Sequence, residues 1–333
     1  MRGCSSFETL QDAWYNALNI RKPPSGRTRR PRCVRLPRSK AEGSGVLRNL
    51  KEFHYPKTVP EALAILERFD SKAAVVAGCT SLGRVDDAKL EAAVDITRMG
   101  LSYVKEDKDF LRLGATTTYE TLAHTRRLQT FAGGMLAKAA SACPSHLIRN
   151  GMTLGGSTVL ATPASELPPA LLALDAEFVI AGVEEQVIPA AQFFAEPEYR
   201  QLGRRAMLTE VRIPRALAGW RSGYATFSRS RSDPAIAIAA VLLQEDEDGK
   251  CAGARVVVGG ICRHATRSAT AEKKLVGKTP GPSQFEQAGR AALKELEAIS
   301  DWRASKEYRV HVAEVLVRRT LAACWEGTKG GAR

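Results

Sequence analysis

Short apolar runs and amphipathic stretches follow one another at close intervals from residue 51 onward. The sequence Thr58-Val-Pro-Glu61 has the pattern of a helix capping box, and apolar residues follow it at helical spacing through Phe69. The apolar run Ala73 to Ala77 stops at Gly78 and predicts a short buried strand. Further strands are predicted at residues 92–96 and 110–114, and a helix after a second capping box, Thr117 to Glu120. This alternation is typical of a mixed α/β layer.

The pattern beyond residue 130 divides at a predicted domain boundary, Pro214 to Gly223. Before it we expect helices ending near residue 142 and at 167–174, an irregular run at 143–151, and strands at 177–181 and 207–213. After it we expect strands at 224–228, 235–243 and 254–260, a hairpin turn at 246–249, and a helix opened by the capping box Ser283 to Glu286. A last helix is predicted from about Ser305 to Trp325, with Tyr308, Val312, Val315, Leu316 and Leu321 facing inward.

The charge of the chain is concentrated at its beginning. Of a net charge of +13 over 333 residues, residues 1–48 hold eleven basic and three acidic residues, a balance of +8. This segment is rich in Pro, Gly and Ser, so it predicts a flexible basic arm, with a short docking helix over Phe7 to Leu18. The nearly neutral remainder argues against a nucleic-acid-binding protein. No stretch predicts a membrane span or an export signal, so we expect a cytoplasmic protein.

Common catalytic and metal-binding motifs are not found in the sequence. The seven cysteines are scattered and form no CxxC pair, which argues against a disulfide framework and an iron–sulfur cluster on this chain. The five histidines stand alone, and no GxSxG, HExxH, Walker or GxGxxG motif occurs. The candidate chemistry is therefore limited to two glycine-bearing turns.

The first turn, Val76 to Gly83, directly follows a predicted strand. Its glycine permits close approach of the backbone, and Thr80 and Ser81 add hydroxyl donors, so it is a candidate cradle for a pyrophosphate group. The second turn, Thr153 to Thr158, has two adjacent glycines and three hydroxyl groups. The residues alone leave an alternative for each turn. The first could be a tight turn that only ends a strand, and the second could be a turn whose glycines only permit close packing.

The order of these pieces resembles the FAD-binding subunit of the xanthine dehydrogenase and carbon monoxide dehydrogenase family of molybdenum hydroxylases. The resemblance covers roughly residues 50 to 327 and rests on six pieces in the family's order. These are Phe53 to Leu63, Ala77 to Leu82, Leu113 to Thr118, Ile148 to Gly156, Pro163 to Ala176 and Asp301 to Arg309.

The resemblance implies an α+β fold. It implies a two-subdomain FAD-binding fold of the vanillyl-alcohol-oxidase (PCMH) type at residues 49–216, divided at about residue 100. A C-terminal α/β domain of the CO dehydrogenase flavoprotein type is implied at 220–328, and the basic arm at 1–48 lies outside the resemblance.

The resemblance also implies a set of FAD-binding residues. The first turn wraps the FAD pyrophosphate in relatives, and the second lies against the other side of the cofactor. Glu166 takes the place of an acid that meets the adenosine ribose, with a helix first-turn acid as the alternative, and Arg229 or Arg231 is expected near the flavin or in a solvated hairpin. The implied residues are Ala77, Gly78, Cys79, Thr80, Ser81, Leu82, Thr153, Gly155, Gly156, Ser157, Glu166 and Arg229.

Four of these positions depart from the family's pattern. Relatives usually have Gly at Cys79, Asp at Ser81, Asn at Ser157 and Asp at Glu166. Backbone donors survive such changes. A cysteine beside the flavin invites comparison with a covalent anchor, but the family binds FAD noncovalently, so we expect Cys79 to be a small buried apolar group.

In relatives this subunit works beside two others. A large subunit holds molybdopterin, a small one carries two [2Fe-2S] clusters, and the flavoprotein passes their electrons to NAD or another acceptor. The rival hypotheses are a self-contained flavin oxidase, for which the C-terminal part is short, and a structural subunit without flavin. The molybdenum subunit determines the substrate, so this chain does not identify it. The residues of the motifs are only slightly more similar to those of purine-type relatives.

Overall fold

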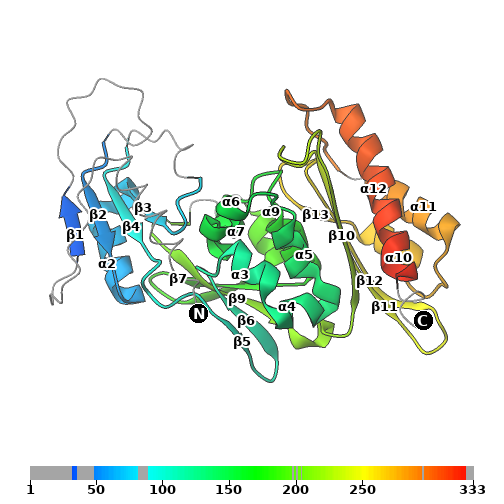
Figure 1. Ribbon diagram of the computed structural model, residues 1–333, viewed down its shortest axis with the longest axis horizontal. Helices are drawn as coiled ribbons and strands as arrows, with labels where there is room; N and C mark the ends of the chain where they lie inside the picture. Colours follow the sequence, from blue (N-terminus) through cyan, green and yellow to red (C-terminus); the bar gives the residue numbers. More distant parts are fainter. Residues whose placement is uncertain are drawn as a thin grey trace.

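The computed structural model describes residues 32–35, 49–81, 89–196, 199, 202–203, 205–294 and 296–327. Within this part of the chain, three β-sheets with their helices follow one another along the long axis of the molecule (Figure 1). Among the described residues, no helix is long and apolar enough to cross a membrane. The predicted docking helix, Phe7 to Leu18, lies outside the described residues, as does most of the predicted arm.

The first sheet has the order β1-β2-β4-β3. It consists of the parallel strands β2 (Glu52–Tyr55), β4 (Ala92–Asp95) and β3 (Ala73–Val76), with β1 (Arg32–Arg35) antiparallel to β2. Helix α2 (Val59–Phe69) and the 3-10 helix η1 (Asp70–Lys72) connect β2 to β3. The Thr58 hydroxyl accepts a hydrogen bond from the Glu61 amide at 3.3 Å, which confirms the first predicted cap. Strand β1 lies within the segment predicted as a flexible arm, so these four residues correct that prediction.

The second sheet is antiparallel throughout and has the order β5-β6-β9-β7-β8. Its strands are β5 (Val104–Glu106), β6 (Phe110–Gly114), β7 (Glu177–Ala181), β8 (Gln186–Pro189) and β9 (Met207–Pro214). Its helices are α3 (Tyr119–His124), α4 (Arg126–Thr130), η3 (Phe131–Gly134), α5 (Met135–Ser141), α6 (His146–Gly151), α7 (Leu154–Leu160), α8 (Leu167–Ala173) and α9 (Ala190–Ala195).

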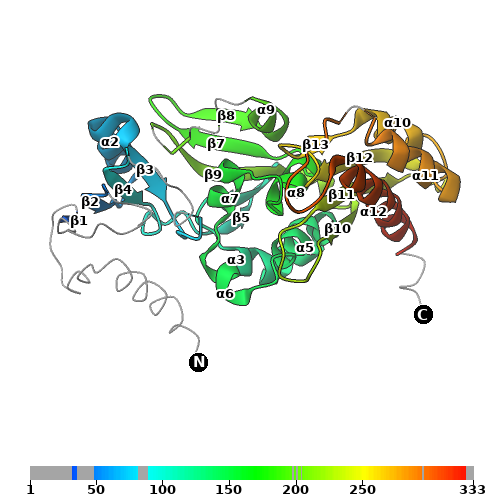
Figure 2. The ribbon, with the colours of Figure 1, turned by 90° about the horizontal axis from the view of Figure 1, so that it is seen from above.

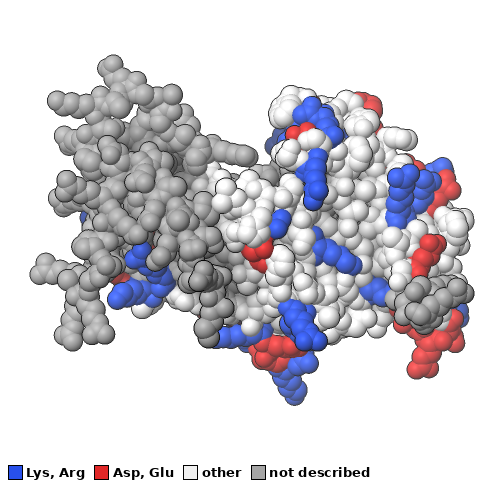
Figure 3. All heavy atoms as spheres, viewed as in Figure 1, with Lys and Arg blue, Asp and Glu red and all other residues white. Residues whose placement is uncertain are grey.

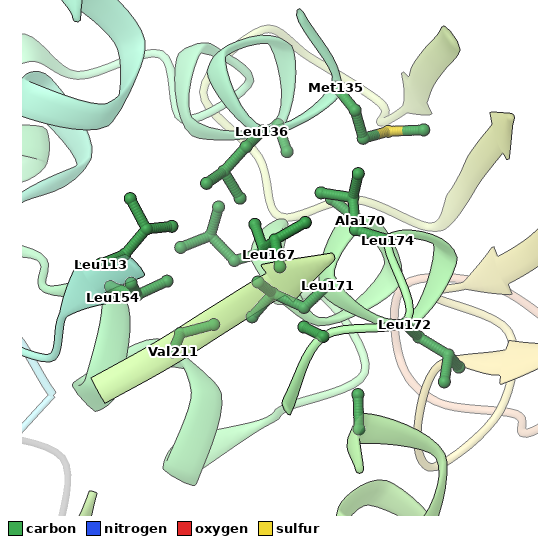
Figure 4. Packing of buried hydrophobic residues seen from close by; sticks show 14 of the residues in the cluster. Leu113, Met135, Leu136, Leu154, Leu167, Ala170, Leu171, Leu172, Leu174 and Val211 are labelled. Carbon is green, nitrogen blue, oxygen red and sulfur yellow. The ribbon is translucent and has the colours of Figure 1, made fainter. Parts of the chain in front are cut away.

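The largest hydrophobic core lies between this sheet and its helices. Leu113 of β6 and Val211 of β9 face Leu154 of α7 and Leu167 and Leu171 of α8, and all five side chains are fully buried (Figure 4). Burying a leucine side chain contributes about 2 kcal/mol of transfer free energy. The hydrophobic effect therefore holds the start of α7 firmly against the sheet.

The third sheet is antiparallel and has the order β10-β11-β12-β13. It is built from β10 (Arg221–Phe227), β11 (Ala237–Glu245), β12 (Cys251–Gly259) and β13 (Thr266–Arg267), after the 3-10 helix η5 (Arg215–Leu217). One face carries α10 (Ala269–Leu275), α11 (Pro282–Ala291) and α12 (Lys306–Glu326), and the other packs toward α5 and α8 (Figures 1 and 2). A Cβ added to Gly259 would lie 2.7 Å from Pro169 Cγ, so β12 and α8 are in close contact.

The last helix buries Leu321 and packs Val312 and Leu316 against the core as predicted, but its first turn departs from the prediction. Tyr308 is 47% exposed, whereas the neighbouring Arg309 is 1% exposed. The Arg309 guanidinium donates to the carbonyl oxygens of Ile236 at 3.0 Å and Gly260 at 2.7 Å, and to the Asp301 carboxylate at 2.5 Å. Tertiary contacts with charged and carbonyl groups thus decided which face of α12 turns inward, because an arginine with these partners is stable in the interior.

Several predicted boundaries need correction. The run 143–151 contains helix α6, and the presumed second turn is the first turn of helix α7, capped by the Thr153 hydroxyl at 3.2 Å from the Gly156 amide. The cap of α3 is Thr118, one residue later than predicted. Helix α11 follows Gly281 without a side-chain cap, so the capping box at Ser283 is wrong. Elements β2, β5, β8, β13, α4, α9 and α10 were not predicted.

Charged side chains are interspersed on the face shown in Figure 3. Over the described part of that face, Lys and Arg side chains alternate with Asp and Glu among uncharged residues. Ion pairs in the described part of the chain join Arg127 to Glu106 at 2.6 Å and Arg267 to Glu272 at 2.7 Å.

Candidate functional site

The bend at residues 77–81 follows the carboxyl end of β3, at the edge of the first sheet. Gly78 is required there by a backbone contact, because a Cβ at this position would lie 1.4 Å from the Gly151 carbonyl oxygen. A Cβ on Gly151, the last residue of α6, would in turn lie 2.9 Å from Thr80 Cγ2. The absence of a side chain at both glycines therefore lets the bend after β3 contact the end of α6 closely. The first sheet meets the helices of the second sheet at this point.

The same bend contains a residue in the left-handed region. Cys79 has a φ of 56°, a value that glycine adopts without strain. A left-handed residue within a bend turns successive backbone amides toward one side, which is the geometry of an anion-binding nest. Among the described residues, no protein group accepts a hydrogen bond from the amides of residues 78–81. Within the described part of the chain, these four N–H groups are therefore available to an external acceptor.

The first turn of α7 is different, since its amides are already used. The Leu154 and Gly155 amides donate to the carbonyl oxygens of Thr117 and Ala115, both at 2.8 Å. The Gly156 and Ser157 amides donate to the Thr153 hydroxyl at 3.2 Å and the Thr153 carbonyl oxygen at 3.0 Å. The amides of residues 154–157 are therefore not free to bind a phosphate group. The second turn was expected to have such free amides.

The glycines of α7 serve close packing. A Cβ on Gly155 would lie 2.9 Å from Ala115 Cβ, and one on Gly156 would lie 2.9 Å from the Thr153 hydroxyl oxygen. The helix start can therefore approach the strand connection after β6 closely enough for the two backbones to exchange hydrogen bonds. We attribute the paired glycines to this approach.

The structure brings both segments to one cleft of about 350 Å³. Residues 77–81 form one wall, and Thr153, Gly155, Gly156 and Ser157 form the other. The cleft lies between the end of β3 and helix α7, which are neighbours in both ribbon views (Figures 1 and 2). The central expectation, that the two glycine-bearing segments face each other, is met in this structure.

Other lining residues were not predicted from the sequence. Ala115, Met152, Leu160, Ser165, Gly203 and Leu208 also line the cleft. Ala115 and Met152 lie inside pieces that carried the family resemblance, which was a usable signal. Gly203 and Leu208 come from the connection to β9 and from β9 itself, and no motif marked them.

The Cys79 thiol is not set up for nucleophilic chemistry. Burial, with a smaller contribution from the nearby Asp95 carboxylate, raises the pKa of Cys79 to about 12. The thiol donates only a long hydrogen bond, 3.5 Å, to the Ala77 carbonyl oxygen. The thiol is therefore unreactive, but Cys79 is only half-buried and lines the cleft, so the expected full burial is corrected.

The left-handed backbone at Cys79 leads to a prediction. Cys79→Gly and Cys79→Ala both remove the sulfur, and only the alanine retains the steric cost of a positive φ. We expect Cys79→Gly to be more stable than Cys79→Ala by roughly 1 kcal/mol. Urea unfolding of both variants measures the difference, and equal stabilities, or a more stable Cys79→Ala, would show that the bend relaxes.

Glu166 lies beside the cleft but does not line it. It is the N-cap residue of α8, and its carboxylate accepts a hydrogen bond from the Tyr119 hydroxyl at 3.4 Å. The Tyr224 hydroxyl donates to the Glu166 backbone carbonyl at 2.8 Å. Burial raises the pKa of the Glu166 carboxyl group above its usual value. The structure thus turns this carboxylate toward the buried Tyr119, and the expected contact with a ribose stays a prediction.

The expected arginine is not brought to the cleft. Arg229 lies 3.6 Å from Asp233, and its guanidinium carbon stands 5.0 Å from the ring centre of the exposed Trp302. Neither Arg229 nor the exposed Arg231 lines the cleft. The solvated-hairpin alternative describes their environment here. Leu82, also expected in the first turn, lies outside the described residues.

The residues present fit the diphosphate of FAD. Four free amides and the hydroxyl groups of Thr80 and Ser81 form a donor-rich wall, and the Gly78 position leaves no room for a side chain. Within the part of the chain that the structure describes, no three His, Cys, Asp or Glu side chains are grouped to hold a metal ion. The amide and hydroxyl donors of this wall are suited to an anionic cofactor.

Comparison with known proteins agrees with this geometry. Residues 48–216 match the FAD binding domain in molybdopterin dehydrogenase, and residues 222–324 match the CO dehydrogenase flavoprotein C-terminal domain. The 6-hydroxypseudooxynicotine dehydrogenase complex subunit alpha of Paenarthrobacter nicotinovorans is 31% identical over 80% of this chain and 91% of the relative. The carbon monoxide dehydrogenase medium chain of Hydrogenophaga pseudoflava is 28% identical over 82% and 96%.

The solved structures point in the same direction. Carbon monoxide dehydrogenase from Hydrogenophaga pseudoflava superposes with a TM-score of 0.77 at 29% identity, covering 82% of this chain and 96% of the other. These matches confirm the α+β fold class with its two expected domains. The chain therefore belongs to the FAD-binding medium subunits of the molybdenum hydroxylase family, and it is an oxidoreductase subunit with FAD as its cofactor.

Proposed function

We propose that this chain is the flavoprotein component of a xanthine dehydrogenase-like complex, located in the cytoplasm. Its partners are a large subunit with molybdopterin and a small subunit with [2Fe-2S] clusters. FAD, when bound, supplies the redox chemistry, receiving electrons from those clusters and passing them to NAD or another acceptor. The observation that carries the proposal is the single cleft between residues 77–81 and the start of α7. The names of relatives, such as the nicotine 6-hydroxylase medium subunit, support the complex.

The residues of this chain bind and position the cofactor in this proposal. The amides of residues 78–81 donate to the diphosphate, and the contact between Gly78 and Gly151 fixes the shape of the bend. Thr153, Gly155, Gly156 and Ser157 form the opposite wall. FAD is held noncovalently in this proposal, and a Cys79 thiol whose pKa is raised by burial agrees with that mode of binding. No side chain of the cleft needs to act as a general acid or base.

The proposal is tested by reconstitution and co-purification. The isolated chain, incubated with FAD and desalted, is expected to show a flavin absorption band that trichloroacetic acid releases completely, because the cofactor is noncovalent. Absence of the band after reconstitution would overturn the proposal and favour a structural subunit.

The heteromeric complex is tested separately from flavin binding. A tagged chain expressed in its native host is expected to co-purify with molybdenum and iron in addition to flavin, and the complex to reduce NAD or an artificial acceptor. A flavin-loaded chain that turns over an organic substrate without metal-containing subunits would instead establish the self-contained oxidase. Fractionation of the host cells tests the cytoplasmic location.

A further inference from the structure

A chain of hydrogen-bonding side chains leads from the cleft wall into the interior. The Ser157 hydroxyl, on the cleft-lining turn of α7, lies 2.6 Å from the Tyr119 hydroxyl of α3. The Tyr119 hydroxyl lies 3.4 Å from the Glu166 carboxylate at the start of α8. Ser157 is 6% exposed and Tyr119 is 0% exposed, so water does not compete for the contact between these two hydroxyl groups. Three helices therefore meet at one polar connection.

The proton of Tyr119 links the two contacts of this chain. A tyrosine hydroxyl has one proton to donate, and either hydroxyl can donate in the short contact between Ser157 and Tyr119. We assign the Tyr119 proton to the Glu166 carboxylate, so that the proton of the short contact comes from Ser157. Ser157 then has no proton for the cleft and presents only its lone pairs there.

The backbone at the start of α7, like the Ser157 hydroxyl, has no proton to donate to the cleft. The amides of residues 154–157 all donate to protein carbonyl or hydroxyl oxygens. A diphosphate oxygen is an acceptor and finds no donor on these groups, whereas a hydroxyl group finds an acceptor in Ser157. The two walls of the cleft therefore differ in what they recognise.

We propose that Tyr119 is a positioning residue that turns Ser157 into a hydrogen-bond acceptor for a hydroxyl group of the cofactor, on its ribose or its ribityl chain. The diphosphate is then held by the opposite wall, residues 78–81. The inference rests on the proposed binding mode of FAD in this cleft. It also accounts for the pair of departures from the family's pattern, because Ser157 and Glu166 are the two ends of the chain through Tyr119.

The first experiment compares ligands that carry different groups. FAD binding to the apoprotein is measured by quenching of flavin fluorescence, with inorganic diphosphate, ADP and FMN as competitors. Ser157→Ala should weaken FAD binding about threefold to tenfold, as expected for one hydrogen bond, and leave competition by inorganic diphosphate unchanged. Weakened competition by ADP identifies the ribose, and by FMN the ribityl chain. A parallel loss for inorganic diphosphate would overturn the inference.

The second experiment tests the role of Tyr119 by a double-mutant cycle. Tyr119→Phe removes the hydroxyl and keeps the buried ring, and it should weaken FAD binding by a similar factor. Combined with Ser157→Ala, it should add no further loss, because both changes break the same connection. Losses that multiply would show that Tyr119 acts only on stability.

Tyr224→Phe is the matched control. It also removes a tyrosine hydroxyl next to Glu166, but that hydroxyl bonds to the backbone carbonyl and has no link to Ser157. Its effect should multiply with that of Ser157→Ala. If the wild-type apoprotein does not bind FAD, the proposed function fails together with this inference. If it binds FAD but the effects of Tyr119→Phe and Ser157→Ala are independent of each other, only the inference is overturned.

Discussion

Gly78→Ala is expected to abolish retention of FAD during purification. The added methyl group would lie 1.4 Å from the Gly151 carbonyl oxygen, and both partners are backbone, so no side chain can rotate away. The bend must move, which separates its four free amides from the positions that bind the diphosphate. We expect FAD affinity to fall by at least a factor of about 100, equivalent to roughly 3 kcal/mol of overpacking.

Alanine variants of two other glycines serve as comparisons for Gly78→Ala. Gly151→Ala brings its Cβ to 2.9 Å from Thr80 Cγ2, a side-chain atom that can shift, so its loss of affinity should be smaller. Gly219→Ala meets no atom within 4 Å and should bind FAD as the wild type does. Fluorescence titration of the three apoproteins ranks them. Wild-type affinity in Gly78→Ala would mean that the contact with Gly151 does not shape the site.

Arg309→Met is expected to destabilise the C-terminal domain by about 3 kcal/mol. Arg309 is buried, and its removal leaves the carbonyl oxygens of Ile236 and Gly260 without this donor, while the Asp301 carboxylate keeps only its contacts with Arg303 and backbone amides. Buried acceptors that lose a charged donor are costly because their desolvation is no longer compensated. Urea unfolding followed by circular dichroism measures the loss.

Arg303→Met is the matched control for this prediction. Its guanidinium pairs with the same Asp301 carboxylate at 2.9 Å but remains 19% exposed, so we expect a cost of about 1 kcal/mol. If the two variants are equally stable, burial of Arg309 is not what makes its contacts strong.

The ion pair also predicts a pH dependence. Despite partial burial, hydrogen bonds from backbone amides and from Arg309 lower the pKa of Asp301 to about 2. A carboxyl group with a lowered folded-state pKa stabilises the protein above its ordinary pKa near 4, and this contribution is lost as the pH falls toward 2. The stability difference between wild type and Asp301→Asn should therefore shrink over that interval. A difference that does not change with pH would contradict the prediction.

The sequence predicted secondary structure best where local chemistry determines it. Thr58 caps α2 as expected, because its hydroxyl satisfies an amide only three residues away. Strand β3 and the bend after it were recognised from an apolar run that ends at Gly78. By contrast, adjacent glycines suggested a turn at 153–158, where the structure has helix α7. Propensity was overruled there by hydrogen bonds to Ala115 and Thr117, which are distant in sequence.

The placement of charged side chains could be predicted least. Tyr308 was expected on the buried face of α12, but it is exposed and its neighbour Arg309 is buried instead. Glu166 turns toward Tyr119, and Arg229 pairs with Asp233 away from the cleft. The position of each of these side chains depends on partners in other helices, strands or loops. A local sequence pattern does not show which of these groups the fold brings close.

The sequence by itself determined the family resemblance, the FAD cofactor and the two segments that form the cleft. Ordered motifs carry this information, because glycines and hydroxyl groups at given positions reflect backbone requirements that are local. Only the tertiary structure decided that the walls differ, with free amides at residues 78–81 and fully used amides at the start of α7. Whether an N–H group is free depends on what the fold places opposite it, and that is a property of the packed chain.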